Sequence, residues 1–370
     1  MIDKHQLAGV EALEATDTFT EPKMLELGNP LSADSQFYIE REVGGAERST
    51  IEAYCTNAIL APGALIRIKG SKRMGKTSLV IRILHQVVDQ HQTIFLSFRT
   101  IEPAVLQDPD QFLQWFCRQV TLGLQLPDRL ADYWDDLFGS TISCKSYFEE
   151  YLLAEIAQPI VLALDDVDRL FAYPDLADEF FGLLRAWHED TKSRDIWKKL
   201  RLIVAHSTEV YIPLNIHKSP FNVGIPIELP ALTQEQVQTL AERYQLRNVE
   251  PWIQPLITLV GGQPYLVQMA LSAAKDDSRS LEQLLQSATI GNGIYAAHLQ
   301  QQWQTLQQNP ALVQSMAEVV HANTPVEIDR LQAFKLQSLG LVRLQGVHAT
   351  PSCALYAHYF KACLASDWLR

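Results

Sequence analysis

Residues 70–77 read Gly-Ser-Lys-Arg-Met-Gly-Lys-Thr and fit the pattern G-x-x-x-x-G-K-[ST]. An apolar stretch before them, residues 64–69, predicts a strand, and residues 78–84 after them predict the start of a helix. A strand, a glycine-bounded loop and a helix N-terminus form a cradle for phosphate, because the loop N–H groups point inward and the helix dipole favours an anion. The alternative is a chance match in a surface loop. The flanking strand and helix favour phosphate binding.

Each residue type in this loop has a chemical role. Gly70 and Gly75 allow backbone angles and close approaches that a Cβ would obstruct. Lys76 is expected to reach the β- and γ-phosphates and to act in catalysis, and the Thr77 hydroxyl is expected to bind Mg²⁺. Two further cations in the loop, Lys72 and Arg73, either contact phosphate or face solvent, and the sequence leaves that open. The predicted nucleotide-binding residues of this segment are Gly70, Arg73, Met74, Gly75, Lys76, Thr77 and Ser78.

A second segment supplies two carboxylates. Residues 160–164 are a continuous apolar run, which predicts a strand buried on both faces in a parallel sheet. Asp165 and Asp166 follow it directly. In a P-loop enzyme the first acid holds the Mg²⁺ shell and the second orients or deprotonates an attacking water, so we assign Asp165 to metal and Asp166 to catalysis. The alternative is a pair of acids that caps the next helix, and the upstream phosphate loop favours the functional interpretation.

Three further strands complete the expected sheet: residues 93–98, 200–205 and 225–229, the last at an edge because of Pro226. The strand at 200–205 is followed by polar residues. Ser207 or Thr208 is preferred as a contact to the γ-phosphate and the water, whereas His206 is equally well explained as a satisfied loop histidine. Residues 127–146 are polar and predict an irregular segment.

A nucleotide site also needs something that holds the base. Residues 36–41 are aromatic and apolar and lie upstream of the phosphate loop, where they are well placed for this role. The alternative is that Phe37 and Tyr38 are plain core residues, and the sequence does not decide between the two. Residues 43–50 predict a loop, and Ser49 or Thr50 is expected to cap a helix that runs to about residue 60.

The pattern changes to helices after residue 230. Residues 233–236 fit a capping box, and in residues 261–266 two glycines end one helix while Pro264 starts the next. After residue 291 come further helices, and residues 331–342 predict a helix, a glycine stop and a strand, with a turn at Gly346. Helices followed by a small β-wing describe a winged helix.

Composition limits the functional classes. A net charge of −12 argues against a protein that coats nucleic acid non-specifically. The five cysteines contain no C-x-x-C pair, so neither a zinc site nor a disulfide framework is indicated. The first 20 residues lack the apolar core of a signal peptide, and no run of about 18 apolar residues predicts a membrane span. We therefore expect a cytoplasmic protein without a membrane partner.

This order of motifs resembles the STAND class of signalling NTPases and, more closely, the bacterial AAA-like domain family, which is related to initiator and archaeal AAA+ ATPases. The resemblance covers about residues 30–365. The motifs that carry it are residues 37–41, 62–68, 73–79, 164–170, 261–266 and 339–342. It implies an α/β P-loop NTPase of the ASCE type, with a parallel sheet of about five strands, followed by a helical lid and a C-terminal winged-helix-like domain. The expected domains are a lead-in (1–35), the NTPase domain (36–229), the lid (230–290) and the winged-helix-like domain (291–370).

The resemblance also implies roles for single residues. Tyr38 and Arg41 would lie against the adenine and ribose, and Pro264 would pack on the base from the lid. The winged-helix-like domain would close over the nucleotide in an inactive state and swing away in an active one. One departure is Asp166, where many fast relatives have Glu, because the shorter carboxylate reaches a water less readily and favours slow hydrolysis. Neither Arg169 nor Arg185 is a clear arginine finger.

The sequence thus predicts a switch that binds ATP or ADP with Mg²⁺, hydrolyses ATP slowly, and controls self-assembly or a protein partner. The first alternative is an ATPase that binds or remodels DNA through its winged helix. Few basic residues lie in the C-terminal stretch, namely Lys335, Arg343, Lys361 and Arg370, and a DNA-reading module normally shows a clustered basic face. The second alternative is a nucleotide-stabilised scaffold with negligible hydrolysis.

Overall fold

The computed structural model describes residues 27–42, 49–135, 137–207, 220–276, 281–288 and 293–367. Several sequence-based expectations lie outside these ranges. They are most of the loop at 43–50, the polar residue Thr208, the C-terminal Arg370 and the greater part of the lead-in.

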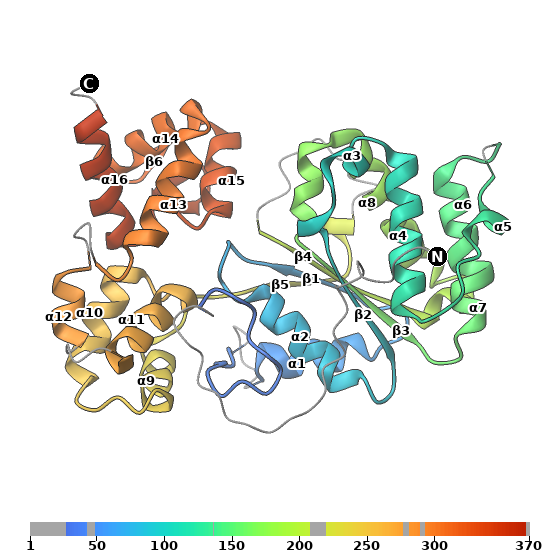
Figure 1. Ribbon diagram of the computed structural model, residues 1–370, viewed down its shortest axis with the longest axis horizontal. Coiled ribbons are helices and arrows are strands. Elements are labelled where there is room, and N and C mark those ends of the chain that lie inside the picture. Colours follow the sequence, from blue (N-terminus) through green and yellow to red (C-terminus); the bar gives the residue numbers. More distant parts are fainter. Residues whose placement is uncertain are drawn as a thin grey trace, which may run out of the picture.

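A five-stranded parallel sheet forms the centre of the first half of the chain, in the order β2-β3-β4-β1-β5 (Figure 1). Its strands are β1 (Leu65–Lys69), β2 (Gln92–Ser97), β3 (Ile160–Asp165), β4 (Leu200–His206) and β5 (Ile225–Glu228). The parallel α/β sheet that the sequence predicts is confirmed. β5 lies at an edge, where the missing N–H of Pro226 is tolerated.

Both faces of this sheet are covered by apolar side chains, as expected for parallel strands. Ile66, Ile68 and Ala163 pack on α1 (Ile51–Ile59) and α2 (Lys76–Val87). Leu162 and Leu164 point to the opposite face, toward α4 (Pro109–Gly123) and α8 (Pro174–Asp190). Figure 1 shows these two helical layers on either side of the sheet. The carboxyl ends of β1, β3 and β4 therefore meet at one edge of a three-layer body.

The segment between β2 and β3 differs from the expectation. The sequence predicts irregular structure over residues 127–146, but the structure forms the helices α5 (Leu130–Tyr133) and α6 (Ser140–Ser146). A π-helical stretch (Tyr147–Leu152) and α7 (Leu153–Glu155) follow, and α3 (Pro103–Leu106) precedes α4. The prediction was wrong because α6 is stabilised by packing rather than by propensity: Cys144 is fully buried and its sulfur lies 3.5 Å from that of Cys117 on α4.

Local signals set the helix ends as expected. Thr50 caps α1 through a hydrogen bond from the amide of Ala53, and Thr233 forms a capping box with Gln236 at the start of α9 (Gln234–Arg243). Gly261, at φ 70°, ends α10 (Glu250–Val260), and Pro264 starts α11 (Pro264–Asp276). With α12 (Leu281–Gln286) these helices form the expected helical segment after the sheet.

The C-terminal part combines helices with a small antiparallel sheet of order β6-β8-β7. Its elements are α13 (Ala296–Gln307), α14 (Pro310–His321), β6 (Val326–Glu327), α15 (Arg330–Ser338), β7 (Val342–Gln345), β8 (His348–Pro351) and α16 (Ala354–Asp367). The helices, the glycine stop and the hairpin that turns at Gly346 follow the order that the sequence predicts. The short strand β6 was not predicted, and the winged-helix assignment stays a prediction.

One hydrophobic core joins the lid helices to the C-terminal part. Leu266 and Ala270 of α11 belong to the same buried cluster as Leu336 of α15 and Phe360 of α16. Phe37 also packs in this cluster, with its ring 4.4 Å from that of Tyr244. The division of the chain at residues 229 and 290 stays a prediction. In the described ranges, no helix combines the length and the apolar character that crossing a membrane requires.

Candidate nucleotide-binding site

The phosphate loop connects β1 to α2 at the carboxyl edge of the sheet. Gly75 takes a left-handed conformation at φ 91° directly before the first helical residue, Lys76. The first amides of a helix have no partner within the helix. Among the described residues, no hydrogen bond uses the amides of residues 75–78. Four N–H groups and the positive end of the α2 dipole are thus available to an anion.

Lys76 lies inside this loop with only 7% of its surface exposed. Its Nζ donates to the carbonyl oxygens of Gly70, at 2.7 Å, and Ser71, at 3.2 Å. Burial lowers the pKa of the ammonium group, and nearby carboxylates, led by Asp168, oppose that lowering. The ammonium group is therefore held in the loop by two carbonyls, beside the acids that follow β3.

Thr77 and Asp165 meet at the end of β3. The Thr77 hydroxyl donates to Asp165 Oδ2 at 2.5 Å, and Asp165 is 1% exposed. Burial, and then the charge of Asp166, raise the pKa of the Asp165 carboxyl, and the bond from Thr77 opposes this rise. A hydroxyl and a carboxylate fit Mg²⁺, which is usually held by few protein oxygens together with phosphates and water. Within the described ranges, no group of three or more His, Cys, Asp or Glu residues forms an all-protein metal cage.

Asp166 adopts a left-handed conformation, with φ 56°, which turns it away from the strand direction. Its Oδ2 accepts a hydrogen bond from Arg99 Nε at 3.1 Å and a longer one from Ser97 Oγ at 3.5 Å. Both partners come from the end of β2 and the turn after it. The carboxylate that we assign to catalysis is therefore part of an ion pair with Arg99.

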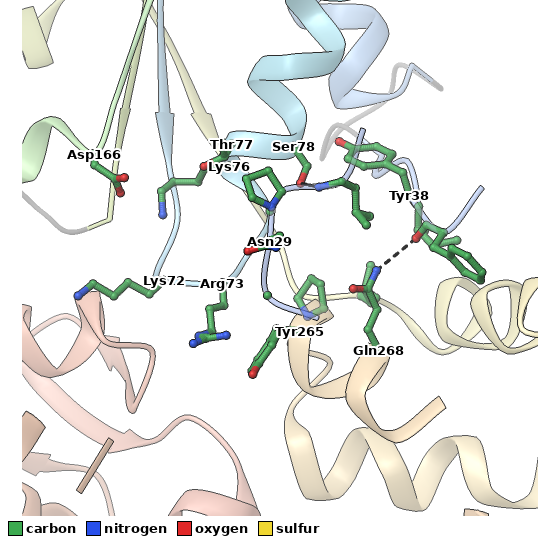
Figure 2. A pocket seen from close by; sticks show the side chains of 18 of the residues that line it. Asn29, Tyr38, Lys72, Arg73, Lys76, Thr77, Ser78, Asp166, Tyr265 and Gln268 are labelled. Atoms are coloured by element: carbon green, nitrogen blue, oxygen red, sulfur yellow. Dashed lines mark hydrogen bonds between the residues drawn. The ribbon is translucent and has the colours of Figure 1, made fainter. Parts of the chain in front are cut away.

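A cavity of about 610 Å³ collects most of the predicted site residues. It is lined by Tyr38, Arg41, Arg73, Gly75, Lys76, Thr77, Ser78, Asp166 and Pro264. Figure 2 shows Lys76 and Asp166 on one side of this cavity and Tyr38 and Gln268 on the other. The cavity thus has a charged end beside the loop and an aromatic end beside the lid.

Three predicted residues line a neighbouring cavity of about 330 Å³ instead: Gly70, Met74 and Ser207. The Ser207 amide and hydroxyl both bond to Asp168 Oδ1, at 2.9 and 3.3 Å. Asp168 itself lines the larger cavity. Ser207 is therefore bonded to Asp168, which lies close after Asp165 and Asp166 in the sequence, while its contact with a phosphate stays a prediction.

Tyr38 and Arg41 are organised by Glu52 of α1. The Tyr38 hydroxyl donates to Glu52 at 2.6 Å, and the Arg41 amide donates to the same carboxylate at 3.3 Å. The Arg41 guanidinium group donates to the carbonyl oxygen of Met74 at 2.9 Å. Tyr38 is 5% exposed and also lines the larger cavity, so it has features of both a core residue and a base-contacting residue.

The sequence reasoning missed several residues that line or shape the site. Arg99 directly follows a predicted strand whose end faces the loop, a position that was readable from topology. Glu52 is a carboxylate within an apolar helix, which is an informative signal because buried charges need partners. Residues 28–31 also line the larger cavity, and the Leu31 amide donates to Ser78 Oγ at 3.0 Å. Nothing in the sequence of that segment indicated such a role.

A family model described as AAA-like domain matches residues 27–362 of this chain. That span is most of the 370 residues. The chain belongs to the AAA-like domain family. Its fold and its phosphate loop are those of a P-loop NTPase, as the resemblance implies.

Solved structures share the fold of this AAA-like domain. A Walker-type ATPase of Pyrococcus abyssi is 11% identical with a TM-score of 0.56, and the match covers 84% of this chain and 94% of that one. The ORC2 protein of Aeropyrum pernix, in complexes with ADPNP and ADP, is 16% identical with a TM-score of 0.50 over 91% of this chain and 99% of that one.

A curated relative of this AAA-like domain is a protein of Synechocystis described as an uncharacterized WD repeat-containing protein. It is 24% identical over 277 residues, or 73% of this chain. The matched part is only 22% of that relative's length.

Proposed function

We propose that this AAA-like domain binds ATP with Mg²⁺ at the loop of residues 70–77, hydrolyses it slowly, and uses the nucleotide state to control self-assembly or a protein partner. One observation carries the proposal: among the described residues, the free amides of residues 75–78, Lys76, and Thr77 with its bond to the buried Asp165 come together at the charged end of a cavity of about 610 Å³. Together they supply what a triphosphate and its metal require.

Each residue then has a defined task. The amides of residues 75–78 and Lys76 bind the β- and γ-phosphates, and Thr77 and Asp165 hold the metal. Bound Mg²⁺ would neutralise charge on the phosphate oxygens. Asp166 accepts a proton from the attacking water or orients it, at the same end of the cavity as Lys76. Tyr38 and Pro264 border the opposite, apolar part, which suits a nucleobase.

Slow turnover follows from the state of Asp166. Its carboxylate accepts a hydrogen bond from Arg99, which competes with a water for the same oxygen, and its side chain is one methylene shorter than that of Glu. Both features reduce the fraction of time in which the carboxylate meets a water in line with the γ-phosphate. Slow hydrolysis gives a long-lived ATP state, which is what a switch needs.

No observation favours the DNA-remodelling alternative over the switch. In the described C-terminal part, Arg343 donates to the Gly261 carbonyl at 3.0 Å, and Arg330 stacks on the ring of Phe334. Two of the few basic side chains there are thus engaged within the protein. A salt-dependent shift with duplex DNA that is lost on Arg343→Glu would reverse this preference.

The test is ATP binding and hydrolysis by three variants. We expect Lys76→Ala to lose about tenfold or more in ATP affinity, because a buried charged hydrogen bond to phosphate is lost. The matched control is Lys192→Ala, at an exposed lysine beyond α8, which should bind as the parent does. Asp166→Ala should lose about a hundredfold in turnover with nearly unchanged affinity. Equal ATP affinity in Lys76→Ala and the parent would refute the site.

A further inference from the structure

Lys72, in the middle of the phosphate loop, has both of its backbone groups bonded to residues far along the chain. Its N–H donates to the carbonyl oxygen of Ser338 at 2.8 Å, at the end of α15. Its carbonyl oxygen accepts from Gln263 Nε2 at 3.2 Å, in the turn between α10 and α11. The shape of the loop is therefore held by the lid and by the C-terminal part together.

Gln263 connects this contact to two more helices. Its Oε1 accepts from the Tyr356 hydroxyl of α16 at 3.4 Å, and that hydroxyl lies 2.8 Å from His298 Nε2 of α13. All three side chains are buried, with 8%, 1% and 3% of their surfaces exposed in the order named. A buried polar group that loses its hydrogen-bond partner costs free energy, so these three side chains hold one another in position. A continuous polar path thus runs from the Lys72 carbonyl to α13.

Arg73 makes a second, independent connection. Its φ of 67° is unusual for a residue with a Cβ, which indicates that its surroundings hold it there. The guanidinium carbon lies 4.0 Å from the centre of the Tyr265 ring on α11, and Nη2 lies 3.5 Å from Gln301 Oε1 on α13. Figure 2 shows the Arg73 side chain directed at Tyr265 rather than at Lys76. The sequence predicts that Arg73 binds nucleotide and leaves open whether it contacts phosphate or faces solvent. In the structure Arg73 lines the larger cavity and its partners belong to the lid and the C-terminal part, while its contact with nucleotide stays a prediction.

We propose that Gln263 and Arg73 are positioning residues that couple the shape of the phosphate loop to the docking of the lid and the C-terminal part. The proposal rests on the nucleotide-binding function given above. In the docked arrangement the loop keeps the amides of residues 75–78 free for phosphate. Docking therefore favours bound nucleotide, and by thermodynamic reciprocity bound nucleotide favours docking. The nucleotide leaves faster when either connection is broken.

Tyr356→Phe tests this coupling at a distance from the nucleotide. Tyr356 does not line the larger cavity, and the substitution removes only the hydroxyl that holds Gln263. We expect ADP to dissociate about fivefold faster, measured by chasing a fluorescent ADP analogue, and ADP affinity to fall by the same factor. The matched control is Tyr359→Phe on the same helix, whose partner is Cys363 rather than the path to the loop. It should release ADP at the parent rate.

Arg73 is tested by a pair of substitutions at its partner. Tyr265→Phe keeps the ring and should release ADP nearly as the parent does, whereas Tyr265→Leu removes the ring and should release it faster. Gln263→Leu should resemble Tyr356→Phe. A purely structural role would lower the melting temperature of the nucleotide-free variants without changing ADP dissociation.

The outcomes separate this coupling from the function on which it rests. Parent-like ADP release by folded Tyr356→Phe and Gln263→Leu would overturn the coupling while leaving nucleotide binding intact. A parent protein that binds neither ADP nor ATP would refute the proposed function itself, and the coupling with it. Faster release by Tyr356→Phe but not by Tyr359→Phe would support the coupling.

Discussion

Arg99 holds Asp166: its Nε lies 3.1 Å from Asp166 Oδ2, and its side chain is 71% exposed. The pair joins the turn after β2 to the residue that follows β3, and both side chains line the larger cavity. An arginine so exposed can leave its partner at little cost, because exposed ion pairs contribute little free energy. The ion pair with Arg99 therefore positions the Asp166 carboxylate but can break at little cost.

Arg99→Ala should free the Asp166 carboxylate for the attacking water. We expect ATP turnover to rise about two- to fivefold, as suits a weak exposed pair, while KM for ATP changes less than kcat. Steady-state kinetics measures both. The control is Arg118→Ala, which breaks another exposed pair, with Asp128 at 3.2 Å, on α4. A fall in kcat for Arg99→Ala alone would show that Arg99 aids the reaction.

Asp165→Asn should stabilise the metal-free protein and weaken its response to Mg²⁺. The pKa of Asp165 is raised by burial, so its contribution to stability is present below the unfolded pKa and is lost as pH rises through the folded value. At neutral pH the buried Asp165 carboxyl therefore makes the folded protein less stable than it would be at low pH. We expect the melting temperature without Mg²⁺ to rise by about 2 °C, and Mg²⁺·ATP to stabilise the variant less than the parent. A lower melting temperature without metal would contradict this.

His298 should make the stability of the protein depend on pH. Burial, and then the charge of Arg73, lower its pKa to about 4 from its ordinary value of 6.5. The neutral ring therefore contributes stability that is present above pH 6.5 and is lost as pH falls toward 4. This loss amounts to about 3 kcal/mol in the free energy of unfolding.

Urea unfolding of the parent and of His298→Gln at pH 7, 5.5 and 4.5 measures this contribution. The parent should lose more stability on acidification than the variant. His348→Gln, at an exposed histidine of β8, is the matched control and should keep the pH dependence of the parent. Parallel curves for the parent and His298→Gln would show that another group is responsible.

Two substitutions at Tyr38 decide between a core residue and a base contact. Tyr38→Phe removes the 2.6 Å bond to Glu52 but keeps the ring, so we expect it to lose about 1–3 kcal/mol in the free energy of unfolding with little change in ATP affinity. Tyr38→Leu also removes the aromatic ring. If the ring contacts the base, ATP affinity falls further for Tyr38→Leu than for Tyr38→Phe; equal affinities identify a core residue.

The sequence determines the fold most clearly where the signal is local. The apolar run of β3 ends at the acids, Thr50 and Thr233 cap their helices, and Gly261 stops α10 at a positive φ. These features follow from backbone chemistry within a few residues. The helix α6 was missed because its formation depends on packing against α4, which no local pattern reveals.

The residues of the site also divide into those that local sequence predicts and those that depend on contacts between distant segments. Lys76 and Thr77 follow from the motif and the strand before it, whereas Arg99, the ion-pair partner of Asp166, comes from the turn after another strand, β2. The sequence leaves open whether Arg73 contacts phosphate or faces solvent, and in the structure its side chain contacts Tyr265, which lies 192 residues along the chain. Long-range contacts of this kind depend on the assembled fold.

The measurement that tests the account most directly is the hydrodynamic size of the parent protein and of Lys76→Ala in three conditions: ADP, a non-hydrolysable ATP analogue with Mg²⁺, and no nucleotide. Turnover is followed in parallel with ATP. We expect the parent to differ in size between ADP and the analogue, to hydrolyse ATP slowly, and to lose the size difference in Lys76→Ala. Fast turnover with one size in all conditions would contradict the switch and identify an ordinary ATPase.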